Sequence, residues 1–166
     1  MGTARKPTVS LFRKMKNEGK KIVMLTAYDA PTAKLAQECG IDIILVGDSL
    51  GMAVLGYTST LPVTLDQSLH HCAAVRRGAP DAFIVGDMPF MTCHASESEA
   101  LKNAARYLQE AGCDAVKIEG DAALAPTVER MVHAGIPVMG HIGLLPQHIK
   151  TSGVYRVTGR GEEEAE

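Results

Sequence analysis

Short apolar runs alternate with amphipathic segments along this chain. Several of the runs end in a residue that can hold a metal ion or move a proton, such as Asp48, Asp87 and His141. Continuous runs of branched aliphatic residues are typical of parallel strands, because helices cover both faces of such a sheet. The pattern therefore predicts an α/β protein with a buried parallel sheet. The predicted strands lie at residues 21–29, 42–48, 81–87, 114–120 and 136–141.

Amphipathic segments between these runs predict helices. Thr64 and Gln67 have the spacing of a capping box at the start of one of them. Another helix, over residues 10–20, is expected to lead into the first strand, with Leu11 and Met15 on its packed side and its basic residues on a solvated face. Ser49–Val63 is predicted to be a long loop, and loops of that length are often functional. The helices between strands are predicted at residues 30–40, 64–78, 96–112 and 121–135.

The regular alternation of strand and helix is shared by two fold classes. It is typical of a (β/α)₈ barrel and of a doubly wound sheet. A complete eight-fold barrel takes about 250 residues, whereas this chain has 166. Its last segment, GRGEEEAE, resembles the first acidic turn of a helix that is cut short. The pattern alone leaves both classes open.

Composition and charge exclude several kinds of partner. The chain is 46% hydrophobic and 22% charged, with a net charge of −2, which is ordinary for a globular protein and gives no basic footprint for nucleic acid or an anionic membrane. No run approaches the roughly 20 apolar residues of a membrane span. The four cysteines are scattered without a C-x-x-C pair. We therefore expect a cytoplasmic protein with reduced cysteines, and neither nucleic acid nor membrane as a partner.

Two aspartates are the first candidate ligands of a metal ion. Asp48 and Asp87 each follow a Val-Gly pair at the end of a predicted strand. Carboxylates on neighbouring strands repel each other unless a cation lies between them, and Mg²⁺ usually takes one or two carboxylates with water or substrate oxygens. The alternative is that both cap the turns that follow them. Glu119, at the end of another strand, favours the metal interpretation and is the third candidate ligand.

Lys117 and Glu119 are two residues apart on one strand, so their side chains share a face. Val116 and Ile118 would then meet the helices, and the charged pair would point into the interior of a barrel. Burying charges is costly unless each one is compensated. A metal ion beside Glu119 and an anionic ligand beside Lys117 would compensate both. The alternative is a structural bridge between the lysine and a carboxylate.

Three further residues are candidates for lining the same site. His141 follows Gly140 at a strand end, so a site role is favoured over that of a core histidine. Tyr28 and Asp29 end the first predicted strand and could face the same cavity, although Asp29 could equally be a helix N-cap. His71 is interpreted as helix surface or packing, and His94 has no evident partner.

The chain resembles one family, the ketopantoate hydroxymethyltransferases, also called 3-methyl-2-oxobutanoate hydroxymethyltransferases. The resemblance runs from about Lys21 to Gly161 and is carried by LTAYD, LVGDSLGM, STLPVTLD, AAVRRGAP, DMPFM, AVKIEG and GHIGLLPQ with GRG after it. It implies a (β/α)₈ TIM barrel of which about the first five β/α units are present. Residues 1–166 would then be one incomplete barrel domain: a lead-in helix over 1–20, strands and helices over 21–141, and a loop with the start of the next helix over 142–166.

The resemblance also implies a function. The family transfers a hydroxymethyl group from 5,10-methylenetetrahydrofolate to 3-methyl-2-oxobutanoate, giving 2-dehydropantoate for pantothenate and coenzyme A synthesis, through an enolate stabilised by Mg²⁺. Asp48 and Asp87 would bind Mg²⁺, with Glu119 as a third carboxylate around it. The 2-oxo acid would bind at Asp48, Ser49, Asp87 and Lys117. The family commonly assembles as a homo-oligomer, a decamer.

The family's general base is a glutamate on a strand beyond residue 166, so no catalytic base is assigned within this chain. We therefore expect the chain alone to be inactive and poorly soluble, and to be the amino-terminal part of a longer enzyme. Two alternatives stay open. One is a Mg²⁺-dependent 2-oxo acid lyase or mutase of the phosphoenolpyruvate mutase and isocitrate lyase type. The other is an inactive barrel fragment.

Overall fold

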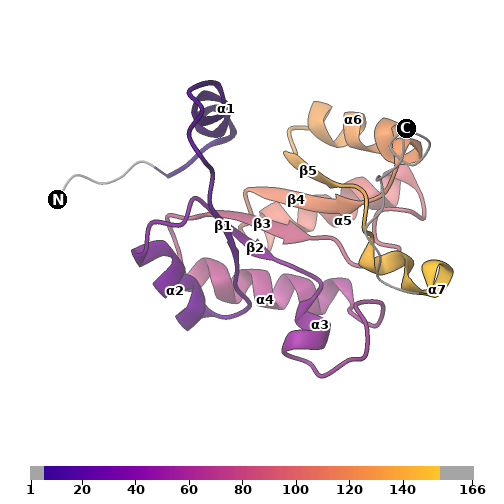
Figure 1. Cartoon of the computed structure of the whole chain (residues 1–166). Coiled ribbons are helices and arrows are strands. Elements are labelled where there is room, and N and C mark those ends of the chain that lie inside the picture. The colour runs from indigo at the N-terminus through magenta and orange to yellow at the C-terminus, as the bar shows by residue number, and fades with distance from the viewer. Residues whose placement is uncertain (1–5, 154–166) are drawn as a thin grey trace.

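The computed structural model describes residues 6–153. A parallel sheet with the strand order β1-β2-β3-β4-β5 forms its centre (Figure 1). The branched aliphatic runs expected to be strands account for these elements, because helices cover one face of the sheet and bury the strands' apolar residues. The strands are β1 (Met24–Thr26), β2 (Ile43–Val46), β3 (Phe83–Asp87), β4 (Ala115–Glu119) and β5 (Val138–His141).

Helices connect consecutive strands. Thr64 and Gln67 form the predicted capping box at the start of α4, each side chain bonding to the other's backbone N–H. The predicted helix over 121–135 begins as a short 3-10 turn, η1, before α6. The helical elements are α1 (Val9–Asn17), α2 (Ala30–Glu38), α3 (Leu50–Ala53), α4 (Leu65–Gly78), α5 (Glu97–Gln109), η1 (Ala122–Leu124), α6 (Ala125–His133), η2 (Pro146–His148) and α7 (Ile149–Ser152).

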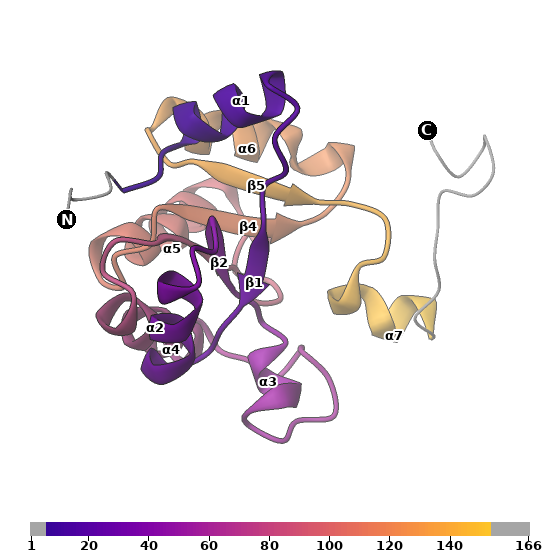
Figure 2. The same ribbon diagram turned by 60° about the vertical axis from the view of Figure 1, so that its left-hand side comes forward.

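The strand order distinguishes between the two fold classes that the sequence leaves open. In a doubly wound sheet the order reverses at a switch point, and helices cover both faces. Here each strand pairs with the next one along the chain, and the helices α2, α4, α5 and α6 lie on one side of the curved sheet (Figures 1 and 2). This is the arrangement of consecutive β/α units in a barrel.

Alternate residues of the strands face two separate apolar clusters. Ile44 on β2 and Val116 on β4 belong to the large cluster shared with the helices. Ile43 on β2 and Ala115 on β4 belong to a smaller cluster on the concave face. The period of two residues in a strand produces this division. The concave face is therefore the interior of the barrel, as predicted from the orientation of residues 114–120.

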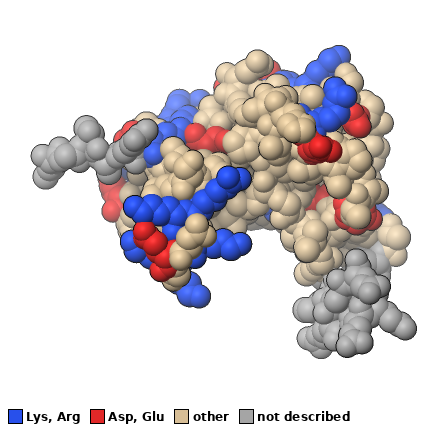
Figure 3. Space-filling model, turned by 90° about the horizontal axis from the view of Figure 1, so that it is seen from above, with Lys and Arg blue, Asp and Glu red and all other residues tan. Residues whose placement is uncertain are grey.

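Helix α1 covers the amino-terminal end of the concave face. Phe12 stacks edge-on against Phe83, with 5.0 Å between the ring centroids. The expectation that Leu11 lies on the packed side was wrong, because Leu11 is 41% exposed. Basic residues of this helix are solvated as expected: Lys14 pairs with Glu18 at 3.7 Å in an exposed i,i+4 contact. On the face seen in Figure 3, Lys and Arg atoms are interspersed with Asp and Glu atoms.

Two expectations about local structure need correction. The predicted loop Ser49–Val63 contains a helical turn, α3. The first strand is shorter than the predicted range 21–29: among the described residues β1 pairs with β2 alone, and this pairing extends over three residues. The expected helix start in GRGEEEAE lies outside the described residues. Within residues 6–153, no helix has the length and apolar character needed to cross a bilayer.

Candidate active site

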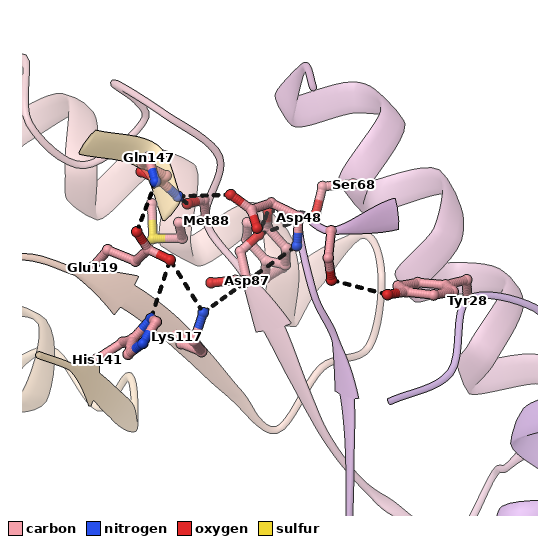
Figure 4. A network of polar contacts seen from close by, with 11 residues as sticks. Tyr28, Asp48, Ser68, Asp87, Met88, Lys117, Glu119, His141 and Gln147 are labelled. Atoms are coloured by element: carbon pink, nitrogen blue, oxygen red, sulfur yellow. Dashed lines mark hydrogen bonds and ion pairs between the residues drawn. The ribbon is translucent and has the colours of Figure 1, made fainter. Parts of the chain in front are cut away.

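The concave face changes from apolar to charged at the carboxyl ends of the strands. Asp87 follows Val85 by two residues, and Lys117 and Glu119 follow Ala115 in the same way, so all three charged residues share the concave face. The sheet register pairs Asp87 with Lys117 and Glu119 with His141. The parallel register therefore brings these side chains together, as the sequence pattern predicted (Figure 4).

Lys117 lies between two buried carboxylates. Its Nζ donates to Asp87 Oδ2 at 2.6 Å and lies 3.8 Å from Glu119 Oε1. The lysine side chain is 12% exposed and the two carboxylate side chains are almost fully buried. The bridge that was the structural alternative is thus present. The bridge also holds the positively charged Lys117 ammonium group at the mouth of the barrel, where an anionic ligand could bind to it.

Asp48 lies in the turn directly after β2 and is 3% exposed. Its backbone N–H donates to Asp87 Oδ2 at 3.2 Å, and its own Oδ2 accepts a bond from Gln147 Nε2 at 3.0 Å. The residue that precedes α3 is Ser49, and it makes no side-chain capping bond. The alternative interpretation of Asp48 as a cap for the following turn is therefore not what the structure shows.

Glu119 is 1% exposed and has partners for both of its carboxylate oxygens. His141 Nδ1 lies 3.1 Å from Oε1, and the backbone N–H of Gln147 donates to Oε2 at 3.1 Å. His141, predicted to lie at the site from its position after Gly140, lines the cavity there, and its role stays a prediction. Its contact is with Glu119.

Burial of two carboxylates side by side raises their pKa values. Desolvation is the main cause for Asp87, and with the nearby charge of Asp48 it raises the pKa of Asp87 to about 7, although Lys117 opposes the shift. The pKa of Asp48 is raised for the same main reason, with Gln147 opposing. Within the part of the chain that the structure describes, Asp87 Oδ1 is also buried without a hydrogen-bond partner. A cation at these oxygens would relieve both effects.

The donor set fits Mg²⁺ with two protein carboxylates. Mg²⁺ commonly uses one or two carboxylates and completes its shell with water or substrate oxygens, and Asp48 and Asp87 can supply these. Glu119 is already engaged by His141 and Gln147. Among residues 6–153, no group of three or more His, Cys, Asp and Glu residues is arranged to hold a metal ion. Glu119 therefore fits a place around the ion better than a direct bond to it.

These residues surround a cavity of about 530 Å³. Ser49, which lines it, contacts the Tyr28 hydroxyl at 2.9 Å, so Tyr28 reaches the site through Ser49. Asp29 turns away and caps α2, accepting from the backbone N–H of Thr32 at 2.8 Å. The cavity is lined by Met24, Leu45, Gly47, Asp48, Ser49, Met52, Thr60, Asp87, Lys117, Glu119, Met139, Gly140, His141 and Pro146.

A second set of polar residues supports the site and was not anticipated from the sequence. Tyr107 donates to the backbone carbonyl of Asp87 at 2.8 Å, and Ser68 donates to the same oxygen at 3.2 Å. His71 Nδ1 lies 2.7 Å from the Tyr28 carbonyl, and His94 Nε2 lies 3.1 Å from the Glu119 carbonyl. Each of the two histidines thus has a specific backbone partner. All four residues lie in helices or loops where local pattern does not distinguish them from packing residues.

Gln147 is the most connected of the unanticipated residues. It stands at the end of the GHIGLLPQ segment and contacts Asp48, Glu119 and the Met88 carbonyl. A neutral polar residue after a strand carries no signal of its own. Its contacts depend on the fold bringing the ends of several strands together.

Comparison with solved structures places the fold among β/α-barrel proteins. The chain is similar to 2,3-dimethylmalate lyase, a member of the PEP mutase/isocitrate lyase superfamily, with a TM-score of 0.64 and 17% identity over 89% of this chain and 56% of that one. A phosphonopyruvate hydrolase in complex with oxalate and Mg²⁺ is also similar, with a TM-score of 0.56 and 16% identity over 66% of this chain and 38% of that one. At these identities the likeness shows the fold alone.

The sequence comparisons show the family. Residues 6–166 match the family model described as ketopantoate hydroxymethyltransferase, and the chain belongs to this family. It is 57% identical to a 3-methyl-2-oxobutanoate hydroxymethyltransferase of Shouchella clausii over 96% of this chain, and 53% identical to one of Heliobacterium modesticaldum over 98%. These alignments cover 57% and 59% of the two relatives, so the chain spans a little over half the length of the curated proteins it matches.

Proposed function

We propose that the enzyme containing this chain transfers a hydroxymethyl group from 5,10-methylenetetrahydrofolate to 3-methyl-2-oxobutanoate. The product is 2-dehydropantoate, an intermediate of pantothenate and coenzyme A synthesis. Family membership supports this reaction. The observation that carries the proposal is the convergence of Asp48, Asp87 and Lys117 on one cavity at the carboxyl ends of the strands. That cavity combines two carboxylates suited to a divalent cation with a positive charge suited to a carboxylate substrate.

Asp48 and Asp87 would hold Mg²⁺, and Glu119 would lie near the ion. When bound there, Mg²⁺ supplies a Lewis acid that draws electron density from the oxygens of the 2-oxo acid. The raised pKa of Asp87 and its unpartnered Oδ1 support a cation at this position. One neighbour of the same fold is described as a complex with oxalate and Mg²⁺. Because that protein is only 16% identical, the proposal rests on the carboxylates of this chain.

The remaining residues of the site would bind and orient the substrate. Lys117 places a positive charge against Asp87 at the level of the cavity, where it can stabilise negative charge that develops on the substrate oxygens. Ser49 can hydrogen-bond the substrate carboxylate, with Tyr28 holding its hydroxyl. His141 lines the cavity and holds Glu119. The proton-abstracting glutamate is still predicted to lie outside residues 1–166.

The second candidate function is a Mg²⁺-dependent lyase or mutase acting on a 2-oxo acid. A 2,3-dimethylmalate lyase has a similar fold, although at 17% identity this likeness does not extend to the reaction. Both reactions need a cation and a bound 2-oxo acid, so the geometry of the site serves either one. They differ in the co-substrate, because only the transferase consumes methylenetetrahydrofolate.

The test uses the product of the complete reading frame that contains this chain. Purified protein is incubated with Mg²⁺ and 3-methyl-2-oxobutanoate, with and without 5,10-methylenetetrahydrofolate, and 2-dehydropantoate is measured by mass spectrometry. We expect product only when folate is present. Conversion of the 2-oxo acid at the same rate without folate would contradict the transferase and support the lyase.

We further propose a homo-oligomer, by family a decamer, working in the cytoplasm. Leu25, an apolar residue of the edge strand β1, is 47% exposed in this chain. Such surface needs covering by further protein, either the same subunit or another. Analytical ultracentrifugation of the complete protein measures the assembly directly, and a monomer at micromolar concentration would contradict this part.

A further inference from the structure

Gln147 connects three strand ends although it belongs to no strand. It lies in η2 after β5 and is 2% exposed. Its Nε2 donates to Asp48 Oδ2 and to the Met88 carbonyl, both at 3.0 Å, and its backbone N–H donates to Glu119 Oε2 at 3.1 Å. Figure 4 shows the side chain pointing toward Asp48 from the side opposite Tyr28. One residue thus joins the segments that follow β2 and β3 to the end of β4.

The orientation of the Gln147 amide follows from its partners. A carboxylate oxygen of Asp48 and a backbone carbonyl of Met88 can only accept hydrogen bonds, so the NH₂ group must face them. Turning the amide over would set Oε1 against two acceptors. In the observed orientation Oε1 is buried without a partner among residues 6–153, and an unpaired buried acceptor is costly. The two hydrogen bonds that the Gln147 NH₂ group donates are therefore made even though Oε1 is left unpaired.

The bond to Oδ2 restricts the Asp48 carboxylate. Gln147 is 99 residues away from Asp48 in the sequence. It is itself held by hydrogen bonds to Met88 and Glu119, so the position of its Nε2 is fixed. With Oδ2 tied to that point, rotation of the carboxylate plane is restricted, and so is the direction of the other oxygen. The backbone N–H of Asp48 meanwhile holds Asp87 Oδ2. Each of the two candidate ligands is therefore held by a hydrogen bond: Asp48 by the Gln147 side chain and Asp87 by the Asp48 backbone.

We propose that Gln147 is a positioning residue for Mg²⁺, which fixes the Asp48 carboxylate from the segment that follows β5. This inference rests on the Mg²⁺ site of the proposed function. Residues that orient metal ligands through hydrogen bonds typically contribute about 10–100-fold to metal affinity. Gln147→Met keeps the size and flexibility of the side chain and removes both donors. It should weaken Mg²⁺ binding by about that factor while the protein stays folded.

The test measures metal binding on the complete protein. Isothermal titration calorimetry gives the Kd for Mg²⁺ of the wild type, of Gln147→Met and of Lys150→Met, which replaces an exposed side chain in the same region of the chain. Electron paramagnetic resonance of bound Mn²⁺ then reports the ligand geometry. We expect a 10–100-fold weaker Kd and an altered Mn²⁺ spectrum for Gln147→Met alone. Lys150→Met should match the wild type.

The outcomes separate this inference from the proposed function. If the wild type binds neither ion, the proposed site itself fails. If the wild type binds Mg²⁺ and Gln147→Met binds it within a factor of about two of the wild type, the site stands and the role of Gln147 is wrong. Gln147→Asn, whose shorter amide cannot reach both acceptors, replaces the methionine variant if that variant does not fold. Failure of both variants to fold would overturn a positioning role, because Gln147 would then serve the fold as a whole.

Discussion

Lys117 Nζ lies 2.6 Å from Asp87 Oδ2, and the two residues face each other in register on the adjacent parallel strands β4 and β3. The ammonium group holds the oxygen that also accepts the Asp48 backbone N–H. If a metal ion bound to Asp87, the ion and Lys117 would therefore share the carboxylate of Asp87. The lysine would compete with a metal ion for this carboxylate, and it is placed to attract an anion beside the metal.

Lys117→Met should therefore separate the two kinds of binding. The affinity for 3-methyl-2-oxobutanoate in saturating Mg²⁺ should fall about 10–100-fold, since a hydrogen bond to a charged group contributes about 1.5–3 kcal/mol. The affinity for Mg²⁺ alone should not fall, because a positive competitor for Asp87 has been removed. Calorimetry on the complete protein measures both, with the exposed Lys102→Met as the control. An unchanged affinity for the 2-oxo acid would mean that the lysine is only a structural bridge.

The raised pKa of Asp87 predicts how the metal-free protein responds to pH. The folded-state pKa is about 7 against 3.8 as its ordinary value. Between these values the folded state binds more protons than the unfolded state, so the free energy of unfolding falls as pH rises. The slope from one such group is at most about 1.4 kcal/mol per pH unit, and it ends above pH 7.

Asp87→Asn should remove this slope. Urea unfolding between pH 5 and 8, with a chelator present, measures the free energy of unfolding of the wild type and the variant. Their difference should grow in favour of the variant up to about pH 7. The control is Asp81→Asn, which changes an exposed carboxyl at the start of the same predicted strand. A pH dependence that is identical in wild type and Asp87→Asn would show that Asp87 is not strained by burial.

Two glycines on strands test the packing beneath the site. A Cβ at Gly86 would overlap with Tyr107 Cδ1, whereas a Cβ at Gly140 would meet no atom within 4 Å. Tyr107 cannot yield easily, because its hydroxyl is bonded to Ser68 and to the Asp87 carbonyl. Gly86→Ala should lower the free energy of unfolding by about 1–3 kcal/mol. Gly140→Ala should change it by less than about 0.5 kcal/mol, and equal effects in a urea titration would contradict the packing described.

Much of the fold could be predicted from the sequence because the strands β2, β3 and β4 are almost entirely buried. Burial of that kind requires continuous apolar runs, which are visible in the chain. The edge strand β1 was predicted too long because hydrophobicity does not reveal that pairing ends at Thr26. The turn α3 was missed because its four residues lie in a glycine-rich stretch without periodicity. Phe12 was missed because its partner Phe83 is brought close only by the fold.

Some residues of the site could likewise be predicted from the sequence, and others could not. Asp48, Asp87, Lys117 and Glu119 could be predicted because the carboxyl ends of parallel strands meet at one end of a barrel. Gln147 could not, since its burial depends on contacts with Asp48, which is 99 residues away in the chain. The family resemblance already implied a place for Glu119 around the ion, but the hydrogen bonds that occupy both Glu119 oxygens and support this place depend on the fold.

Coupled binding of Mg²⁺ and 3-methyl-2-oxobutanoate, measured by calorimetry on the complete protein, is the decisive experiment for the cation site at Asp48 and Asp87. The 2-oxo acid should bind measurably only when Mg²⁺ is present. Asp48→Asn and Asp87→Asn should each weaken Mg²⁺ binding at least about tenfold. Binding of the 2-oxo acid with equal affinity in the presence of a chelator, or unchanged Mg²⁺ affinity in both variants, would contradict a shared cation at these two carboxylates.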